Sequence, residues 1–197
     1  MKQLIIGLGT GRCGTNSLQT LLSKQPNCTC FHEHRPRPNW DNDEVTVTEK
    51  IKYLMTLWQK YVGDVGMYYL PYVDFLMDKY PDCKFVCLKR DKEQTVQSFM
   101  KKTPERNHWM PNNGEWKKDP NWDQCFPKYD VERKLEALET YWDDYYDRSE
   151  KYADKYPRNF KIFKIEDLNN EKQVDRILNF CKFEKKNIVT NLRLNKS

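Results

Sequence analysis

A glycine-rich segment near the beginning of the chain has the residue types of a phosphate site. Residues 7–17 read Gly-Leu-Gly-Thr-Gly-Arg-Cys-Gly-Thr-Asn-Ser, between a short apolar run at 3–8 and leucines at helical spacing in 15–24. A turn from a strand into a helix directs backbone N–H groups and the positive end of the helix dipole at one point. The segment therefore predicts an anion site, to which four side chains add hydrogen-bond donors: Arg12, Thr15, Asn16 and Ser17.

Two common nucleotide-binding motifs are alternatives for this loop. The motif of nucleoside triphosphatases requires lysine at position 15 and serine or threonine at 16, whereas the chain has Thr15 and Asn16. The dinucleotide motif GxGxxG matches Gly9-x-Gly11-x-x-Gly14, and Glu33 follows 19 residues after Gly14. That short motif is weak evidence alone, and it would place a bulky arginine in the tight turn. A NAD-type oxidoreductase or kinase-like nucleotide-binding protein is the alternative function.

A second group of polar residues follows a later predicted strand. Residues 84–89 form an apolar run typical of a buried strand, and residues 92–102 have the pattern of a helix. Arg90 comes directly after that strand, and Ser98 lies eight residues further along, within the helix. Because the carboxyl ends of parallel strands meet at one edge of a sheet, we expect Arg90 to lie near the glycine-rich loop.

Together these segments resemble the sulfotransferase family that depends on 3′-phosphoadenosine 5′-phosphosulfate (PAPS). Residues 9–18 are similar to the 5′-phosphosulfate loop of that family. Arg90 and Ser98 match its arginine and serine, eight residues apart, that bind the 3′-phosphate. A weaker match is the segment 163–168, similar to a strand and acidic turn near the family's C-terminus. The resemblance spans residues 3 to about 182.

The resemblance implies a function and a set of site residues. The function is transfer of a sulfuryl group from PAPS to a hydroxyl or amine acceptor by in-line displacement. The loop amides and the side chains of Thr15 and Asn16 would hold the 5′-phosphate, Arg12 would reach the sulfuryl oxygens, and Arg90 with Ser98 would bind the 3′-phosphate. The predicted PAPS-binding set is therefore Gly11, Arg12, Cys13, Gly14, Thr15, Asn16, Ser17, Arg90 and Ser98. A member that binds the nucleotide and transfers nothing is a third hypothesis.

The acceptor hydroxyl also needs a general base. The segment 31–35, Phe-His-Glu-His-Arg, follows a predicted second strand and so is expected to face the same crevice. In some branches of the family a glutamate follows the second strand, which favours Glu33 as the base, with His34 and His32 as alternatives. Arg12, Glu33 and His34 are thus the predicted catalytic residues.

The chain departs from the family pattern in two places. The tyrosine that often precedes the acidic turn is Ile165 here, and the glycine-rich basic segment that closes over the 3′-phosphate in the cytosolic branch is absent. The tail around Arg193 and Lys196 is a candidate substitute for that segment.

Strands and helices alternate along the chain, which predicts an α/β fold with a mainly parallel sheet and helices on both faces. We expect one domain over residues 1–197. Residues 103–128 hold four prolines and three tryptophans without periodicity, and they predict a long loop that covers the acceptor as a lid. The expected strands are 3–8, 28–31, 64–69, 84–89 and 160–165, and the expected helices are 15–24, 47–62, 71–80, 92–102, 130–155 and 171–182.

The composition of the chain limits the class of protein and the kinds of binding partner to be expected. The chain has 197 residues, 14% of them aromatic, and a net charge of +5 built from 34 basic and 29 acidic side chains, which favours a folded domain without a nucleic-acid partner. Seven cysteines, mostly in predicted strands and helices, are typical of a reducing compartment. No run of 18 apolar residues predicts a membrane span. We therefore expect a soluble cytoplasmic protein that acts on a small molecule, a glycan or a peptide.

Cysteines and histidines alternate in residues 28–34, which suggests a zinc site. The spacing of residues along a strand argues against such a site. Cys28 and Cys30 lie on the predicted strand 28–31, and His32 and His34 continue the same alternation directly after it. Residues two apart on a strand stand roughly 6–7 Å apart, whereas zinc ligands lie at roughly 2.0–2.3 Å from one ion. At most two of the four could share a metal, so the sequence predicts none.

Overall fold

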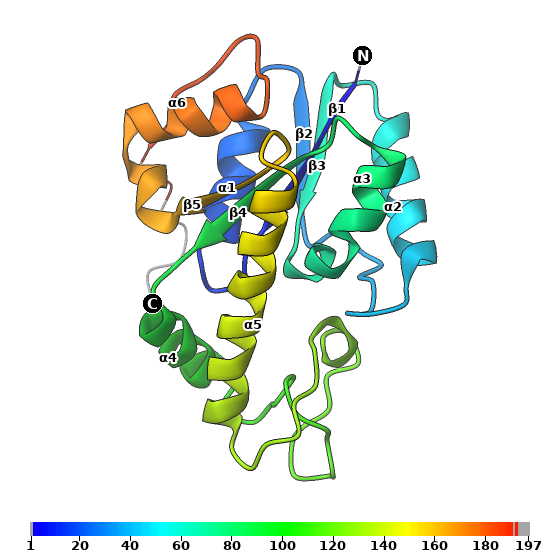
Figure 1. The fold of residues 1–197 in the computed structure, drawn as a ribbon, viewed down its shortest axis with the longest axis vertical. Coiled ribbons are helices and arrows are strands. Elements are labelled where there is room, and N and C mark those ends of the chain that lie inside the picture. Colours follow the sequence, from blue (N-terminus) through cyan, green and yellow to red (C-terminus); the bar gives the residue numbers. More distant parts are fainter. Residues whose placement is uncertain (1, 191, 193–197) are drawn as a thin grey trace.

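The structure is a computed structural model that describes residues 2–190 and 192. Within these residues it contains one five-stranded sheet in which every pair of neighbouring strands is parallel (Figure 1). The strand order is β2-β3-β1-β4-β5. The strands are β1 (Gln3–Leu8), β2 (Cys28–His32), β3 (Tyr61–Val65), β4 (Lys84–Lys89) and β5 (Phe160–Lys164). The predicted α/β class with a mainly parallel sheet is confirmed.

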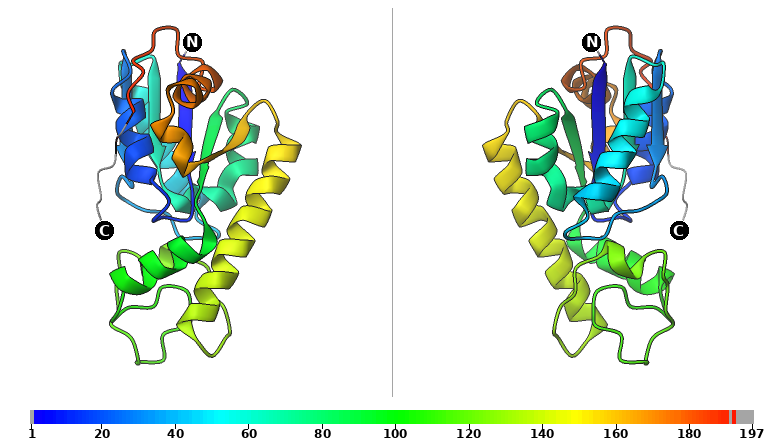
Figure 2. Two further views of the ribbon diagram at one scale, coloured as in Figure 1. Left: turned by 90° about the vertical axis from the view of Figure 1, so that its left-hand side faces the viewer. Right: turned by 90° about the vertical axis from the view of Figure 1, so that its right-hand side faces the viewer.

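Helices cover both faces of the sheet (Figures 1 and 2). One face carries α1 (Thr15–Ser23) and α6 (Glu171–Phe180), and the other carries α2 (Glu44–Thr56), α3 (Val73–Lys79) and α5 (Lys134–Lys155). A further helix, α4 (Lys92–Lys102), packs against α5 beyond the carboxyl ends of the strands. Three 3₁₀ turns complete the description: Met67–Tyr72, Asp123–Cys125 and Ile165–Asn169.

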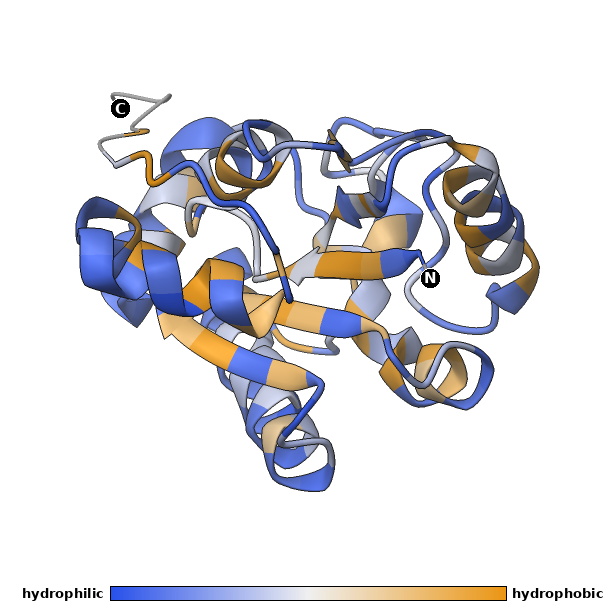
Figure 3. Ribbon diagram, turned by 90° about the horizontal axis from the view of Figure 1, so that it is seen from above, coloured by the Kyte–Doolittle hydropathy of each residue, from blue (hydrophilic) through white to orange (hydrophobic). Residues whose placement is uncertain are grey.

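The alternation of side chains along each strand builds two hydrophobic cores. In β1, Ile6 and Leu8 join the core beneath α2, α3 and α5, whereas Ile5 joins the core beneath α1 and α6. Because both faces of the sheet are covered, all six residues of β1 are buried. In Figure 3 the strands accordingly run as apolar bands through the middle of the molecule. All seven cysteines are free, and six of them are buried.

The predicted strand at 64–69 and the predicted helix at 47–62 are wrong in their bounds. Helix α2 ends at Thr56, and β3 begins at Tyr61. Trp58, which lies within the predicted helix 47–62, is 83% exposed. Tyr61 fits both a helical and a strand pattern, so spacing alone assigned it to the wrong element. The residues after β3 form the 3₁₀ turn Met67–Tyr72 rather than a strand.

The long loop and the last helices agree more closely with expectation. Residues 103–128 contain one 3₁₀ turn, Asp123–Cys125, and otherwise no regular element. Helix α5 begins at Lys134 rather than at 130, and β5 ends at Lys164 rather than at 165. In α5, Tyr145 is buried but Leu135 is 40% exposed, because the buried face of the helix also runs through Tyr141 and Tyr146.

The topology creates one crevice at the carboxyl edge of the sheet. The connection from β1 leads through α1 to β2, on one side of β1, and the connection from β4 leads through α4 and α5 to β5, on the other side. Adjacent parallel strands whose connections diverge in this way leave a crevice at their ends, where ligands of such sheets bind. The glycine-rich loop follows β1 and Arg90 follows β4, so both open onto this crevice.

Candidate active site

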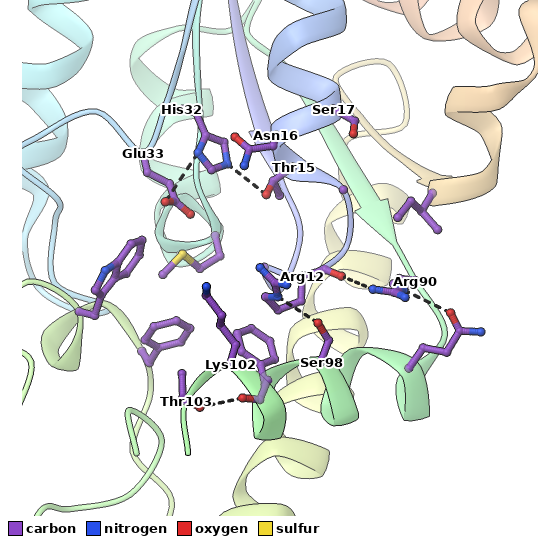
Figure 4. A pocket seen from close by; sticks show the side chains of 18 of the residues that line it. Arg12, Thr15, Asn16, Ser17, His32, Glu33, Arg90, Ser98, Lys102 and Thr103 are labelled. Atoms are coloured by element: carbon purple, nitrogen blue, oxygen red, sulfur yellow. Dashed lines mark hydrogen bonds and ion pairs between the residues drawn. The ribbon is translucent and has the colours of Figure 1, made fainter. Parts of the chain in front are cut away.

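A pocket of about 570 Å³ lies at this crevice (Figure 4). Its volume falls within the roughly 300–1,000 Å³ of small-molecule sites. Its walls come from the glycine-rich loop, from the end of β2, from α4, from the loop 103–128, and from the turn Ile165–Asn169. With Met67 after β3, all five strands or the segments that follow them contribute to one pocket. Most of the residues predicted for the PAPS site line it: Gly11, Arg12, Gly14, Thr15, Asn16, Ser17, Arg90 and Ser98.

The glycine-rich loop has a backbone that requires its glycines. Gly11 has a φ of 85° and Gly14 a φ of 91°, both in the left-handed region that disfavours side chains. A Cβ on Gly14 would also lie 2.9 Å from Cγ1 of Ile165. Arg12 adopts a φ of 55° between them. Local strain of this kind persists only where the surroundings hold it in place.

Three buried tyrosine hydroxyls from α5 hold the loop in place. Tyr141 donates to the carbonyl oxygen of Thr10 at 2.9 Å, and Tyr145 accepts from the amide of Gly9 at 3.0 Å. Tyr146 donates to the carbonyl oxygen of Leu88, at the end of β4, at 2.8 Å. Each of the three tyrosines is 1% exposed. Since buried polar groups without partners are costly, these bonds tie the loop and the end of β4 to one helix.

The two predicted phosphate motifs are in direct contact. Nε of Arg12 donates to Oγ of Ser98 at 3.0 Å, and a guanidinium N–H of Arg90 donates to the carbonyl oxygen of Arg12 at 2.9 Å. Nε of Arg90 also donates to Oε1 of Gln94 at 3.3 Å. In Figure 4 the side chains of Arg12 and Arg90 lie at adjacent positions along the pocket. Two permanent positive charges and a hydroxyl thus converge on one place, which suits a ligand with more than one anionic group.

The remaining loop residues take different positions. Oγ1 of Thr15 lies 3.1 Å from Nε2 of His32, and Asn16 lines the pocket beside it. The hydroxyl of Ser17 donates to the carbonyl oxygen of Leu192 at 2.7 Å. The side chain of Cys13 is fully buried beneath the loop, and burial raises the pKa of its thiol. Cys13, one of the predicted PAPS-binding residues, does not line the pocket.

Glu33 and His32 form the wall at the end of β2. Glu33 has a left-handed φ of 52°, and its amide donates to the carbonyl oxygen of Val65 at 2.9 Å. Its carboxylate lies 3.7 Å from Nδ1 of His32. Burial raises the pKa of Glu33 to about 7, against the opposing influence of the nearby guanidinium of Arg37. Burial also lowers the pKa of His32, so near neutral pH His32 is uncharged while Glu33 exchanges its proton.

A buried ion pair fixes the chain next to Glu33. Asp64 in β3 is 1% exposed and lies 3.3 Å from Nζ of Lys50, which is 4% exposed. Asp64 accepts further hydrogen bonds from the hydroxyl of Tyr69 at 2.8 Å and from the amide of His34 at 3.3 Å. Nζ of Lys50 also donates to the carbonyl oxygen of His34. Both main-chain polar groups of His34 are thereby bound, which positions the turn that carries Glu33.

The prediction that His34 faces the crevice is wrong. His34 does not line the pocket. Its ring stacks on Tyr53 of α2, with the ring centroids 5.3 Å apart and the planes 11° apart. The left-handed conformation of Glu33 interrupts the alternation of the strand, so His34 does not point where strand geometry would direct it. Of the predicted catalytic residues, the pocket brings together Arg12 and Glu33, with His32 beside them.

Comparison with known proteins agrees with this geometry. A family model described as a sulfotransferase domain matches residues 4–167. The chain belongs to the sulfotransferase family. No curated protein matches the sequence.

Two solved sulfotransferases share the fold. A sulfotransferase from Alicyclobacillus acidocaldarius matches with a TM-score of 0.61 and 15% identity, covering 100% of this chain and 87% of that one. The mouse sulfotransferase SULT7A1, complexed with PAP, matches with a TM-score of 0.57 and 14% identity, covering 94% of this chain and 61% of that one. At such identities the likeness concerns the fold.

Several pocket residues of this sulfotransferase lay outside the sequence prediction. Lys102, at the end of α4, points into the pocket in Figure 4. Its position four residues after Ser98, one helical turn on the same face, was a usable signal. Met67, which follows β3, lines the pocket, as do His108 and the aromatic residues Phe99, Trp122 and Phe126. Trp122 and Phe126 belong to the long loop 103–128.

The other predictions for this region concern the tail, metals and membranes. Leu192 lines the pocket, but Arg193 and Lys196 lie outside the described residues. Within residues 2–190 and 192, no group of three His, Cys, Asp or Glu side chains is arranged to hold a metal ion. In the same residues no helix combines the length and the apolar character needed to span a membrane.

Proposed function

We propose that this sulfotransferase transfers a sulfuryl group from PAPS to a hydroxyl or amine acceptor by in-line displacement. The observation that carries the proposal is the contact between the two phosphate motifs. Arg90 bonds to the backbone of the glycine-rich loop, and Arg12 of that loop bonds to Ser98. A nucleotide with phosphates at both its 5′ and 3′ positions needs two anion sites at a fixed separation in one pocket. The proposal assigns the 5′-phosphate to the loop and the 3′-phosphate to Arg90 and Ser98.

The pocket suits a reaction whose main demand is charge stabilisation. PAPS supplies an activated sulfuryl group on a phosphate leaving group, whose developing charge needs neutralisation more than a proton. Arg12 is permanently protonated and lies in the loop that the 5′-phosphate would occupy. The loop amides add donors that need no reorganisation, because the tyrosines of α5 already hold them. Arg12 is therefore the proposed stabiliser of the departing group.

Glu33 is the proposed general base for the acceptor. It lines the same pocket as Arg12, and its pKa of about 7 lets it take a proton near neutral pH. His32 stays as an alternative, but its Nε2 is already in contact with the hydroxyl of Thr15. The acceptor would enter between Glu33 and the aromatic wall of the long loop, and it is a small molecule, a glycan or a peptide.

The raised pKa of Glu33 predicts the pH dependence of transfer. Below pH 7 the carboxyl group is protonated and cannot accept a proton, so kcat/KM should rise as pH increases through about 7 and then level off. Glu33→Gln should abolish this rise and lower kcat/KM above pH 8 by on the order of 10²-fold. The measurement is kcat/KM between pH 5.5 and 9, with Glu139→Gln on the exposed side of α5 as the control. An unchanged pH profile in Glu33→Gln would remove Glu33 from the reaction.

Arg90→Ala tests the assignment of the 3′-phosphate. A charged hydrogen bond contributes about 1.5–3 kcal/mol, so the variant should bind adenosine 3′,5′-bisphosphate roughly 10- to 100-fold more weakly. Its affinity for 5′-AMP should change little, because that nucleotide has no 3′-phosphate. Isothermal titration calorimetry measures both affinities, and Lys92→Ala, two residues further along and paired with Asp143, is the charge-matched control. Equal losses for the two nucleotides would contradict the assignment.

We also propose that the protein acts in the cytoplasm. The seven free cysteines support a reducing compartment.

A further inference from the structure

A histidine and an aspartate of the long loop form a hydrogen-bonded pair at the pocket wall. Nδ1 of His108 lies 2.7 Å from Oδ1 of Asp123, fifteen residues later. The His108 side chain is 6% exposed and that of Asp123 is 30% exposed. His108 lines the pocket. A carboxylate is a hydrogen-bond acceptor, so Nδ1 must be the donor, and the neutral ring then carries its lone pair on Nε2.

The second ring nitrogen of His108, Nε2, has no hydrogen-bond partner among the described residues. Within those residues it is also not one of the fully buried polar atoms without a partner. The small exposed part of the side chain must therefore include Nε2. Because the pocket is the space that His108 lines, Nε2 is available to a ligand there.

The surrounding loop holds the pair rigidly. Oδ2 of Asp123 accepts from the amide of Asp119 at 2.7 Å, which leaves its other oxygen for His108. Nζ of Lys128 donates to the carbonyl oxygens of both His108 and Asp123 at 2.5 Å. The ring of His108 stacks on Phe126, with centroids 5.4 Å apart and planes 14° apart. The hydrogen bond to Asp123, the stacking on Phe126 and the bond from Lys128 to the main chain together fix the orientation of the imidazole.

Charges around His108 agree with a neutral ring at pH 7. Burial lowers the pKa of His108, and the positive charge of Lys128 also lowers it. The carboxylates of Asp123 and Asp119 raise this pKa. The net direction is downward from 6.5. Near neutral pH the lone pair on Nε2 is therefore free to accept a proton or a hydrogen bond.

We propose that His108, positioned by Asp123, is an alternative proton acceptor to Glu33 for the transfer, at the part of the pocket wall that the long loop forms. The O–H bond of the acceptor breaks and its proton moves to Nε2. The freed oxygen forms a bond to sulfur, while the S–O bond to the 5′-phosphate breaks and that phosphate leaves with the electron pair. The resulting imidazolium is stabilised by Asp123. This inference rests on the proposed function and extends it, because the long loop then contributes a proton acceptor as well as part of the pocket wall.

The tautomer of His108 tests the geometry without any substrate. The chain has three histidines, so long-range ¹H–¹⁵N spectra of the labelled protein at pH 7.5 contain three imidazole patterns, and His108→Gln identifies the one from His108. The proposal expects a neutral ring with its proton on Nδ1, and it expects Asp123→Asn to disturb that pattern. A proton on Nε2, or a charged ring at this pH, would overturn the proposal.

Turnover of the variants tests the chemistry. His108→Gln should lower kcat by at least tenfold, and in the Glu33→Gln background it should lower kcat at least tenfold further. Asp123→Asn should lower kcat with little change in KM, whereas Asp130→Asn, at an exposed carboxylate shortly after the long loop, should match the wild type. Unchanged kcat and pH profile in His108→Gln, in both backgrounds, would refute the proposal.

Binding of adenosine 3′,5′-bisphosphate separates this inference from the proposed function. All His108 and Asp123 variants should bind the bisphosphate as the wild type does, which also shows that they are folded. If the wild type itself does not bind the bisphosphate, the proposed function fails, whereas loss of the expected tautomer with binding intact refutes only the role of His108.

Discussion

Arg12→Ala is expected to lower kcat by about 10²–10³-fold, a loss of about 3–4 kcal/mol in transition-state stabilisation. The reason is its position in the loop assigned to the 5′-phosphate, together with its bond to Ser98 at 3.0 Å, which holds the guanidinium within the pocket. Affinity for adenosine 3′,5′-bisphosphate should fall less than kcat does, because the loop amides and Arg90 remain. Steady-state kinetics with PAPS and calorimetry with the bisphosphate measure the two quantities.

The matched control for this experiment is Arg176→Ala. Arg176 is an exposed arginine of α6 whose bond is to its neighbour Gln173, away from the pocket. Its removal should leave kcat unchanged. If Arg12→Ala bound the bisphosphate normally and retained wild-type turnover, charge stabilisation by Arg12 would not be part of the reaction. If the wild type bound the bisphosphate and transferred nothing to a broad panel of acceptors, the non-transferring hypothesis would hold.

Asp64→Ala is expected to lower the free energy of unfolding by about 3–5 kcal/mol. The substitution leaves Lys50, which is 4% exposed, without its counter-charge, and it removes the acceptor of the Tyr69 hydroxyl. The loss should appear in urea unfolding as a lower midpoint at an unchanged slope. Because the same pair positions the backbone of His34 beside Glu33, kcat/KM should fall as well.

A double-mutant cycle with Lys50→Met separates this ion pair from a general packing effect. When the charge of Lys50 is removed too, no unpaired buried charge remains, so the double variant should be more stable than the sum of the single losses by about 1–3 kcal/mol. Strictly additive losses would show that Asp64 and Lys50 do not depend on each other. In that case the pair would not be the element that fixes the turn at Glu33.

The predicted residues that line the pocket are those whose positions are determined by local chain geometry. The glycine-rich loop, α1, β4 and α4 each follow from short runs of residues, and Arg90 and Ser98 keep their relation because a strand end and the next helix are close in sequence. The approach of the two motifs follows from the parallel sheet. This is why most of the predicted nucleotide residues line one pocket.

The parts that were missed depend on contacts that no local pattern encodes. His108 and Asp123 are fifteen residues apart in an aperiodic loop, and only the folded loop places them together. His34 was misplaced because a single left-handed residue, Glu33, ends the alternation of β2. The supporting tyrosines of α5 are more than 130 residues from the loop that they hold, as with Tyr145 and Gly9.

Calorimetric titration of the wild type with adenosine 3′,5′-bisphosphate, compared with NAD, ATP and 5′-AMP, tests the central claim most directly. The two phosphate motifs in one pocket predict tight binding of the bisphosphate, weaker binding of 5′-AMP, and no preference for NAD or ATP. Binding of NAD or ATP without binding of the bisphosphate would contradict the account, since the contact of Arg90 with the glycine-rich loop would then serve another ligand.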